Sequence, residues 1–413
     1  MTFSIQTIDK LKIMNKMRII KMNIILEIKS SRFINRLVSC VVSCVASCLA
    51  SSLANLSSSR FSLSACFAVL SFLASFSADS QTSAEVLFQT LSEKSEEGIL
   101  FGHHDDPLYG FSWTKEGVSD TYAVCGKYPA VVGFDMSGIE KGRSSYPSMS
   151  FGRVREEILK QHENGGYTVL SWHATNPVTG GNAWDVSDTN AVHAVLNEKV
   201  AHVAMCQQLD SLAKFLLSLR SADGSLIPVI FRPFHECHGA WFWWGSKCSS
   251  AADYVSLWHF TVNYLKSAGV TNVVYVFSPA SDFGSEANYL QRYPGDEFVD
   301  ILGFEGYRRT AASVEESRRE FIQRMNSNLA IVEPLALKKQ KLVALTETGG
   351  RNNNDAKWWT KAVIAGLKGH RVTYLEVWRN ATNNLKECYG VYPGCLSEKD
   401  FRKFSKNSAV LFR

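Results

Sequence analysis

Residues 342–349 read Leu-Val-Ala-Leu-Thr-Glu-Thr-Gly, a short apolar run that ends in a carboxylate. Runs of this kind are typical of strands that are buried on both faces of a parallel sheet. Seven similar runs, rich in Val, Ile, Leu and Phe, occur along the chain: Ile99–His103, Ala130–Asp135, Thr168–His173, Ile227–Arg232, Val273–Ser278, Val299–Glu305 and Val372–Trp378. Together with Leu342–Glu347 they make eight predicted strands.

Longer segments with helical periodicity separate these strands. Ala191–Arg220 and Ser313–Leu335 carry apolar residues at spacings of three and four, which is the pattern of an amphipathic helix. Eight strand–helix units predict an α/β fold, a (β/α)8 TIM barrel formed by a single catalytic domain over residues 83–413. An open doubly wound sheet is the alternative, but no GxGxxG turn follows the first strand.

Residues 1–82 do not continue this alternation. Basic residues are scattered as far as Arg36, and two apolar runs follow, Val38–Ala54 and Phe61–Phe76. A basic region, an apolar region and small residues at Ser75–Ser77 are the marks of a secretory signal. We therefore expect residues 1–82 to be a leader, unstructured or removed, and the protein to be exported to the periplasm, the medium or the cell surface.

Two further features bear on the membrane. Leu63-Ser64-Ala65-Cys66 resembles a bacterial lipobox, although apolar residues continue beyond the cysteine, so a lipoprotein remains the alternative to a secreted protein. Neither apolar run reaches the ~20 residues that spanning a bilayer requires, so we expect no stable membrane span.

The formal charge of +5 is unevenly distributed. Residues 1–82 hold nine of the 44 basic residues and three of the 39 acidic ones, so they carry +6 and the remainder carries −1. A nearly neutral domain has no electrostatic footprint for nucleic acid, and we expect a monomer that binds none. Six cysteines lie in the domain, of which Cys388 and Cys395, close together in a predicted loop, are the expected disulfide pair.

The predicted strands end in residues that can do chemistry. A barrel gathers the carboxyl ends of all its strands on one rim, where active sites lie. The residues at or just beyond these ends are His103, Asp135, His173, Glu236, Ser278, Glu305 or Tyr307, Glu347 and Trp378. This series predicts a polar, extended cleft.

Glu236 follows the fourth predicted strand and is followed closely by the aromatic stretch Trp241–Trp244. An apolar wall disfavours an ionised carboxylate and raises its pKa, which suits a general acid near neutral pH. Aromatic rings also stack on the C–H faces of sugars. In the alternative interpretation the aromatic residues are core and Glu236 is a cap or an ion-pair residue. Four adjacent large rings, however, point in several directions and cannot all be buried.

Glu347 ends the seventh strand, opposite the fourth in an eight-stranded barrel. Two carboxylates placed in this way can flank a glycosidic bond, and their separation decides whether configuration is retained or inverted. The alternative for Glu347 is a structural acid.

Five motifs resemble glycoside hydrolase family 26, most of whose members are β-mannanases. They are Gly102–Asp106 with Tyr109-Gly110, Arg232–Glu236 with Gly239–Gly245, Gly303–Tyr307, Thr346–Gly349 and Trp378–Asn380. The resemblance covers residues 84–385. It implies a (β/α)8 barrel, a retaining mechanism without metal or cofactor, and β-mannan or manno-oligosaccharides as substrate, with β-1,3-xylan or mixed-linkage β-glucan as alternatives within the family.

The resemblance also implies a role for each matching residue. Glu236 would be the acid/base and Glu347 the nucleophile, with Tyr307 bonded to the nucleophile. His235 and Trp378 would hold the sugar at the cleavage point. The other expected substrate contacts are His103, His173, Trp184, Arg232, Trp241, Glu305 and Arg379. Three positions depart from the family pattern, since Glu305 replaces an expected Asp, His104 a common Gln, and Cys237-His238 a frequent Met-Asn pair.

Two interpretations from other classes remain. A metal-dependent hydrolase could use His103, His104, Asp105, Asp106, His235 and His238, but adjacent residues of a strand point to opposite sides and the spacing is not HExxH. A non-catalytic glycan-binding barrel would share the aromatic cleft but would not need two acids. We expect Trp258, Trp358 and Trp359, in helical segments, to pack against the barrel.

Overall fold

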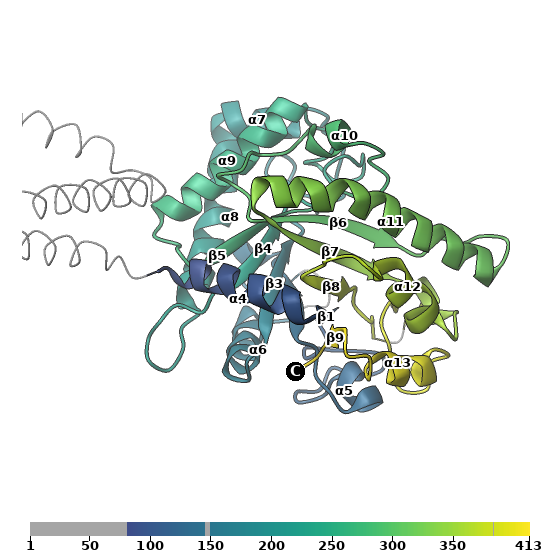
Figure 1. The fold of residues 1–413 in the computed structure, drawn as a ribbon. Helices are drawn as coiled ribbons and strands as arrows, with labels where there is room; N and C mark the ends of the chain where they lie inside the picture. The colour runs from purple at the N-terminus through teal and green to yellow at the C-terminus, as the bar shows by residue number, and fades with distance from the viewer. Residues whose placement is uncertain (1–80, 145–148, 383) are drawn as a thin grey trace, which may run out of the picture. The chain divides into compact units, whose positions relative to one another are not determined.

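The computed structural model describes residues 81–413 except 145–148 and 383. Eight parallel strands form the barrel, each bonded to the next in chain order, and β1 pairs with both β8 and β2, which closes the ring (Figure 1). The strands are β1 (Ile99–His104), β2 (Val131–Asp135), β3 (Tyr167–Trp172), β4 (Val229–Pro233), β5 (Val273–Phe277), β6 (Ile301–Tyr307), β7 (Leu342–Gly349) and β8 (Tyr374–Val377). All eight predicted strands are present, and the barrel is confirmed.

Helices surround the strands (Figure 1). Among the described residues, the α-helices of at least five residues are α4 (Ser83–Glu97), α5 (Asp120–Cys125), α6 (Phe151–Glu163), α7 (Ala191–Asn197), α8 (Lys199–Ser218), α9 (Ala251–Ser267), α10 (Glu286–Leu290), α11 (Val314–Lys339) and α13 (Glu398–Phe404), and the one-turn α12 (Ile364–Leu367) follows a short π-helix, Trp359–Val363. The predicted helix Ala191–Arg220 is two helices, because Glu198 has extended backbone angles and separates α7 from α8.

The barrel interior has an apolar half and a polar half. Near the amino ends of the strands, inward residues such as Val131, Ile230 and Ala344 pack together, and Leu87 and Leu91 of α4 join this cluster. Helix α4 begins with a capping box in which Thr82 and Glu85 bond each other's backbone N–H groups. Because the apolar cluster occupies the amino end of the barrel, its polar interior residues lie toward the carboxyl end.

Three features differ from the sequence predictions or lie outside them. A two-residue strand, β9 (Val410–Leu411), pairs with Ile99 and Leu100 at the start of β1 and was not predicted. The expected Cys388–Cys395 disulfide is wrong: both are buried free thiols, and Cys388 Sγ contacts the carbonyls of Ala381 and Asn384 instead. Within the described residues, no helix has the length and apolarity to cross a bilayer, and residues 1–80 of the predicted leader lie outside that part of the chain.

Candidate active site

A cleft of about 720 Å³ opens at the carboxyl ends of the strands. Nine residues predicted from the sequence to form the site line it: His173, Trp184, His235, Glu236, Trp241, Tyr307, Glu347, Trp378 and Arg379. The three other predicted residues, His103, Arg232 and Glu305, are buried and do not line the cleft. The structure therefore brings both predicted catalytic acids and most of the predicted contact residues to one place.

Glu347 is held through both of its carboxylate oxygens. The β7–β8 register shifts between Leu345 and Thr348, which interrupts the strand pairing where Glu347 lies. Arg232 Nη2 donates to Glu347 Oε1 at 2.5 Å, and the Tyr307 hydroxyl donates to Oε2 at 2.6 Å. Charge-assisted bonds of this kind are short and strong, and they fix the position of a carboxylate.

Glu236 has an unusual backbone conformation just beyond β4. Its φ of 52° and the φ of 48° at Phe234 lie in the left-handed region, and its N–H donates to the Ser278 carbonyl at 2.8 Å. Non-glycine residues in this region cost about 1–3 kcal/mol and are concentrated at functional sites. The carboxylate accepts a 2.6 Å bond from Trp241 Nε1. Burial raises the pKa of Glu236, and the negative charge of Glu347 raises it further.

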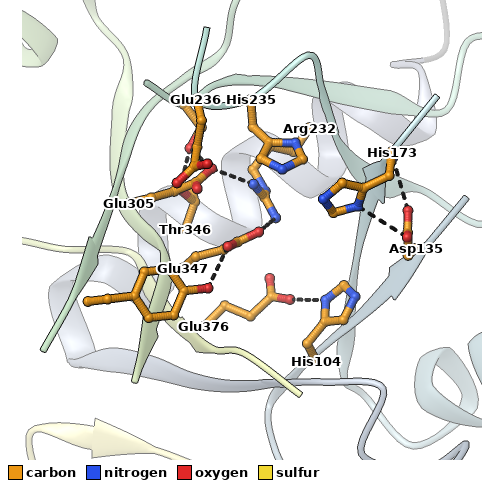
Figure 2. Close-up of polar contacts among 12 residues, drawn as sticks. His104, Asp135, His173, Arg232, His235, Glu236, Glu305, Thr346, Glu347 and Glu376 are labelled. Carbon is orange, nitrogen blue, oxygen red and sulfur yellow. Dashed lines mark hydrogen bonds and ion pairs between the residues drawn. The ribbon is translucent and has the colours of Figure 1, made fainter. Parts of the chain in front are cut away.

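Arg232 and Glu305 form the buried base of the site (Figure 2). The Arg232 guanidinium, fully buried, lies between Glu347 and Glu305 and donates to Glu305 Oε1 at 2.6 Å. Burial, followed by the charges of Glu347 and Glu236, holds the pKa of Glu305 well above its ordinary value. Glu305 and Glu236 lie close enough for each to influence the pKa of the other. The Arg232 guanidinium meanwhile balances the charge of Glu347.

Arg232, Glu305 and His103 were predicted to contact sugar, and the structure places all three in buried positions that do not line the cleft. Arg232 and Glu305 are buried beneath the cleft, where the Arg232 guanidinium contacts Glu305 Oε1. His103 contacts the Thr121 hydroxyl at 2.9 Å, and its neighbour His104 lines the cleft instead. Successive residues of a strand point to opposite sides. A prediction placed one residue later in β1 would therefore have named His104 as the residue that lines the cleft.

Aromatic rings form the walls of the cleft. Trp184 is 54% exposed and Trp241 44% exposed, whereas Phe242 and the two tryptophans after it are buried, so the four adjacent rings are divided between cleft and core. Trp184 stacks on His173 with ring centroids 4.9 Å apart, and Trp378 stacks on His104 at 4.1 Å. Trp258, Trp358 and Trp359 are buried, as predicted.

Two buried histidines under these rings are fixed by carboxylates (Figure 2). His173 Nδ1 lies 3.1 Å from Asp135 Oδ2, and His104 Nδ1 lies 2.7 Å from Glu376 Oε1. Burial opposes a charge on His104, but Asp105 and the bond to Glu376 raise its pKa overall. These carboxylates fix the two imidazole rings in position, His173 against Trp184 and His104 against Trp378.

Comparison with known proteins agrees with this geometry. The model of glycosyl hydrolase family 26 matches residues 76–380. The chain belongs to glycosyl hydrolase family 26. A β-mannanase of this family from Bacteroides ovatus is 40% identical, with a TM-score of 0.76 over 80% of this chain and 94% of that one. An endo-β-1,4-mannanase from Cellulomonas fimi is 32% identical, with a TM-score of 0.73 over 80% of this chain and 76% of that one.

A mannan endo-1,4-beta-mannosidase from Bifidobacterium adolescentis is 31% identical over 79% of this family 26 chain. The chain covers only 34% of that relative, and it also spans less than half of the curated relatives from Thermothelomyces thermophilus and Caldalkalibacillus mannanilyticus.

In this family 26 chain, one set of side chains within the described residues has the geometry for a metal ion. His235, Glu305 and Glu347 each offer a ligand atom, and these atoms lie within 4.8 Å of one another. Arg232, however, is paired with both carboxylates, and its charge contributes to the lowered pKa of His235. A guanidinium among the ligands would repel a cation, so the set does not fit a metal. Another ligand of the metal-hydrolase alternative, His238, lies apart and bonds the Asn288 carbonyl.

Arg232→Met should destabilise the family 26 domain strongly. Removing one member of a buried ion pair leaves its partner without compensation, which costs about 3–5 kcal/mol. Denaturant unfolding should show this loss. The matched control is Arg402→Gln, which breaks the exposed pair with Glu398 and should cost at most ~1 kcal/mol. Equal midpoints for the two variants would contradict a structural role for Arg232.

Proposed function

We propose that the chain is a retaining β-1,4-mannanase that cleaves β-mannosidic bonds in mannan, glucomannan or galactomannan by double displacement. One observation carries the proposal. Two acids, one just beyond β4 and one on β7, line the same cleft in different electrostatic environments. Glu347 accepts a charged hydrogen bond at one oxygen and a neutral one at the other, while burial favours a proton on Glu236. Environments that separate two carboxyl groups in this way distinguish nucleophile from acid. The names of the relatives support mannan as the substrate.

In the first step Glu347 attacks the anomeric carbon as the bond to the glycosidic oxygen breaks. Glu236 gives its proton to that oxygen, and the leaving sugar departs as an alcohol. Arg232 and Tyr307 hold the attacking carboxylate in place. In the second step Glu236, now ionised, takes a proton from water, and the resulting hydroxide attacks the anomeric carbon and releases Glu347. Two inversions give net retention.

The exposed rings suit an extended polysaccharide. Trp184 and Trp241 line the cleft and are partly exposed, and Trp378, which also lines it, stacks on His104. Stacked rings bury the C–H face of a sugar and leave its hydroxyls to Arg379, His173 and His235. This division of the surface supports a polymeric substrate over a small metabolite.

Assays on β-mannan, glucomannan, β-1,3-xylan and lichenan, with product sizing, test the proposal. We expect mannan and glucomannan to be cleaved fastest. Proton NMR of the first product should show the β-anomer. A first product of α configuration would contradict a nucleophilic role for Glu347. Faster cleavage of xylan or lichenan than of mannan would show that another glycan is the preferred substrate of the same mechanism. Binding of mannan without turnover would favour a glycan-binding barrel.

The activity should fall on the alkaline side as Glu236 loses its proton. Because the Trp241 N–H stabilises the ionised carboxylate, it lowers the pKa of Glu236 against the effect of burial. Trp241→Phe removes this donor, so the alkaline limb of kcat/KM against pH should move to higher pH. Trp184→Phe, which loses no contact with Glu236, is the control and should leave the limb in place. A shift to lower pH in Trp241→Phe would contradict the role of this bond.

We further propose that residues 1–82 direct export and that the mature enzyme acts outside the cytoplasm. The basic region, the apolar runs and the small residues at Ser75–Ser77 support this. Amino-terminal sequencing of the protein from the medium or the cell envelope should find a start near residue 78. Labelling by palmitate at Cys66 would instead favour the lipoprotein alternative.

A further inference from the structure

The indole ring of Trp378 is held in the cleft by other rings. Trp378 directly follows β8, and His104 stacks on it with the two ring planes 24° from parallel. His173 meets it in a T-shaped arrangement, with ring centroids 6.0 Å apart. Its backbone N–H donates to the Thr348 carbonyl, whereas no protein acceptor contacts its indole N–H in the described part of the chain. The tilt of the indole therefore depends on the imidazole of His104.

The imidazole of His104 is fixed in turn by Glu376, which lies deeper in the barrel (Figure 2). Both side chains of this pair are completely buried, and Glu376 does not line the cleft. Alternate residues of a strand point to the same side, so Glu376 lies on the same side of β8 as Trp378 and closer to the amino end of the barrel. Glu376 can therefore act on Trp378 through His104 without contacting a ligand.

The neighbouring strand β2 leaves space for the His104–Glu376 pair. Gly133 is paired with His104 in the β1–β2 register. A Cβ atom on Gly133 would overlap both Glu376 Oε1 and His104 Nδ1. The backbone of Gly133 does not lie in the left-handed region, so the space and not the conformation requires glycine here. The close approach of Glu376 to His104 is thus built into three strands of the barrel.

Several carboxylates surround the His104 imidazole, and they differ in what they contribute. Burial opposes a charge on His104, whereas Asp105, Glu376 and Asp135 raise its pKa. Asp105 Oδ2 lies 3.8 Å from Nε2 of the ring, beyond hydrogen-bond distance, and Asp135 is bonded to His173. Glu376 Oε1, at 2.7 Å from Nδ1, forms the hydrogen bond. Glu376 therefore fixes the direction of the ring in addition to favouring its charge.

We propose that Glu376 is a positioning residue for the platform under the sugar at the cleavage point. Glu376 fixes the imidazole of His104, and the imidazole sets the tilt of Trp378. The proposal rests on the proposed function, because it takes Trp378 as the floor beneath that sugar. It deepens that function by giving a role to a side chain that does not reach the substrate. Orientation of this kind affects the rate because a small misplacement of the sugar removes the alignment that the reaction needs.

Kinetics of three variants on one strand test the role of Glu376. Glu376→Leu removes the acceptor at similar volume, and kcat on mannan should fall by about 10- to 100-fold, with KM changing much less. Glu376→Gln keeps a neutral acceptor for the His104 N–H and should regain most of the lost rate. Tyr374→Phe, two residues earlier on β8, is the control. The Tyr374 hydroxyl is buried and bonds no protein group among the described residues, so kcat should stay near the wild-type value.

A double-mutant cycle tests whether the effect passes through Trp378. A second route exists, because burial opposes the charge of Arg232 whereas neighbouring carboxylates, Glu376 among them, raise its pKa. Arg232 holds the nucleophile Glu347. In a Trp378→Ala background, Glu376→Leu should lower kcat no further, within about twofold, because contacting residues are coupled. A loss by the same factor in both backgrounds would assign the effect to Arg232 and overturn the proposal.

Fluorescence tests the contact without turnover. An imidazolium on the face of an indole interacts with its π electrons and quenches its emission. The emission of Trp378 is the difference between a protein and its Trp378→Phe counterpart, and it should rise with pH as His104 loses its proton. Glu376→Gln removes a charge that raises the pKa of His104, so this step should move to lower pH. His104→Gln should abolish it.

Three results would overturn the proposal. They are a step that does not move in Glu376→Gln, a step that persists in His104→Gln and so belongs to His173, and wild-type kcat in a folded Glu376→Leu protein. If Glu376→Leu does not fold, the fluorescence of Glu376→Gln decides. The two proposals fail separately: without cleavage of mannan the proposed function fails, whereas a step that moves in Glu376→Gln still supports the positioning of Trp378.

Discussion

Glu347→Ala should lower kcat on mannan by about four orders of magnitude or more, as removal of other covalent nucleophiles does. The acid supplies the bond that replaces the glycosidic bond in the first step, and no described neighbour can substitute for it. Tyr307 and Arg232 both direct their protons at Glu347 and are donors, not nucleophiles, and Glu305 is buried beneath the cleft. KM should change much less than kcat, because the walls of the cleft remain.

A matched control is available on the same surface. Glu387 also lines the cleft, and it pairs with Arg351 and Arg379. Glu387→Gln should keep kcat within about tenfold of the wild type if only the nucleophile is indispensable. Azide added to Glu347→Ala should attack from the vacated face and give a glycosyl azide of inverted configuration. Residual activity within tenfold of the wild type, with the native fold retained, would exclude Glu347 as the nucleophile.

The barrel could be predicted from the sequence because its strands are buried on both faces. Such strands are nearly continuous apolar runs, and Leu342–Leu345 is a clear example. The β9 strand could not be found in this way, since two residues carry no periodicity. The division between α7 and α8 could not be predicted from the sequence either. The apolar spacing continues through Glu198, and only the backbone conformation of this residue interrupts the helix.

The positions of the acids followed from topology, but their surroundings did not. Strand ends meet on one rim, so Glu236 and Glu347 were expected to be near each other. Arg232 bonds residues 73 and 115 positions away in the chain, and no local pattern indicates such pairings. The cysteine prediction failed for a related reason, because spacing fixes where Cys388 lies along the chain but not which way its side chain points.

Glu236→Ala should affect substrates according to their leaving groups. A sugar leaving from mannan is a poor leaving group and needs the proton of Glu236, so kcat/KM on mannan should fall by about 10²–10⁴. A dinitrophenyl mannoside releases dinitrophenolate, which needs no proton to leave. The first step on this substrate should therefore proceed at nearly the wild-type rate. Stopped-flow measurement should then show a burst of dinitrophenolate followed by slow turnover, because Glu236 is also the base that activates water in the second step. Equal losses on both substrates would exclude Glu236 from this role.

Azide distinguishes the two acids with a single reagent. In Glu236→Ala the sugar is already bonded to Glu347, and azide needs no base, so it should restore turnover and give a glycosyl azide of retained configuration. In Glu347→Ala the same reagent acts in place of the nucleophile and inverts the configuration. The opposite outcomes follow from the face of the sugar that each acid contacts. They therefore test the placement of Glu236 and Glu347 on opposite sides of the bond, independently of how much activity either variant keeps.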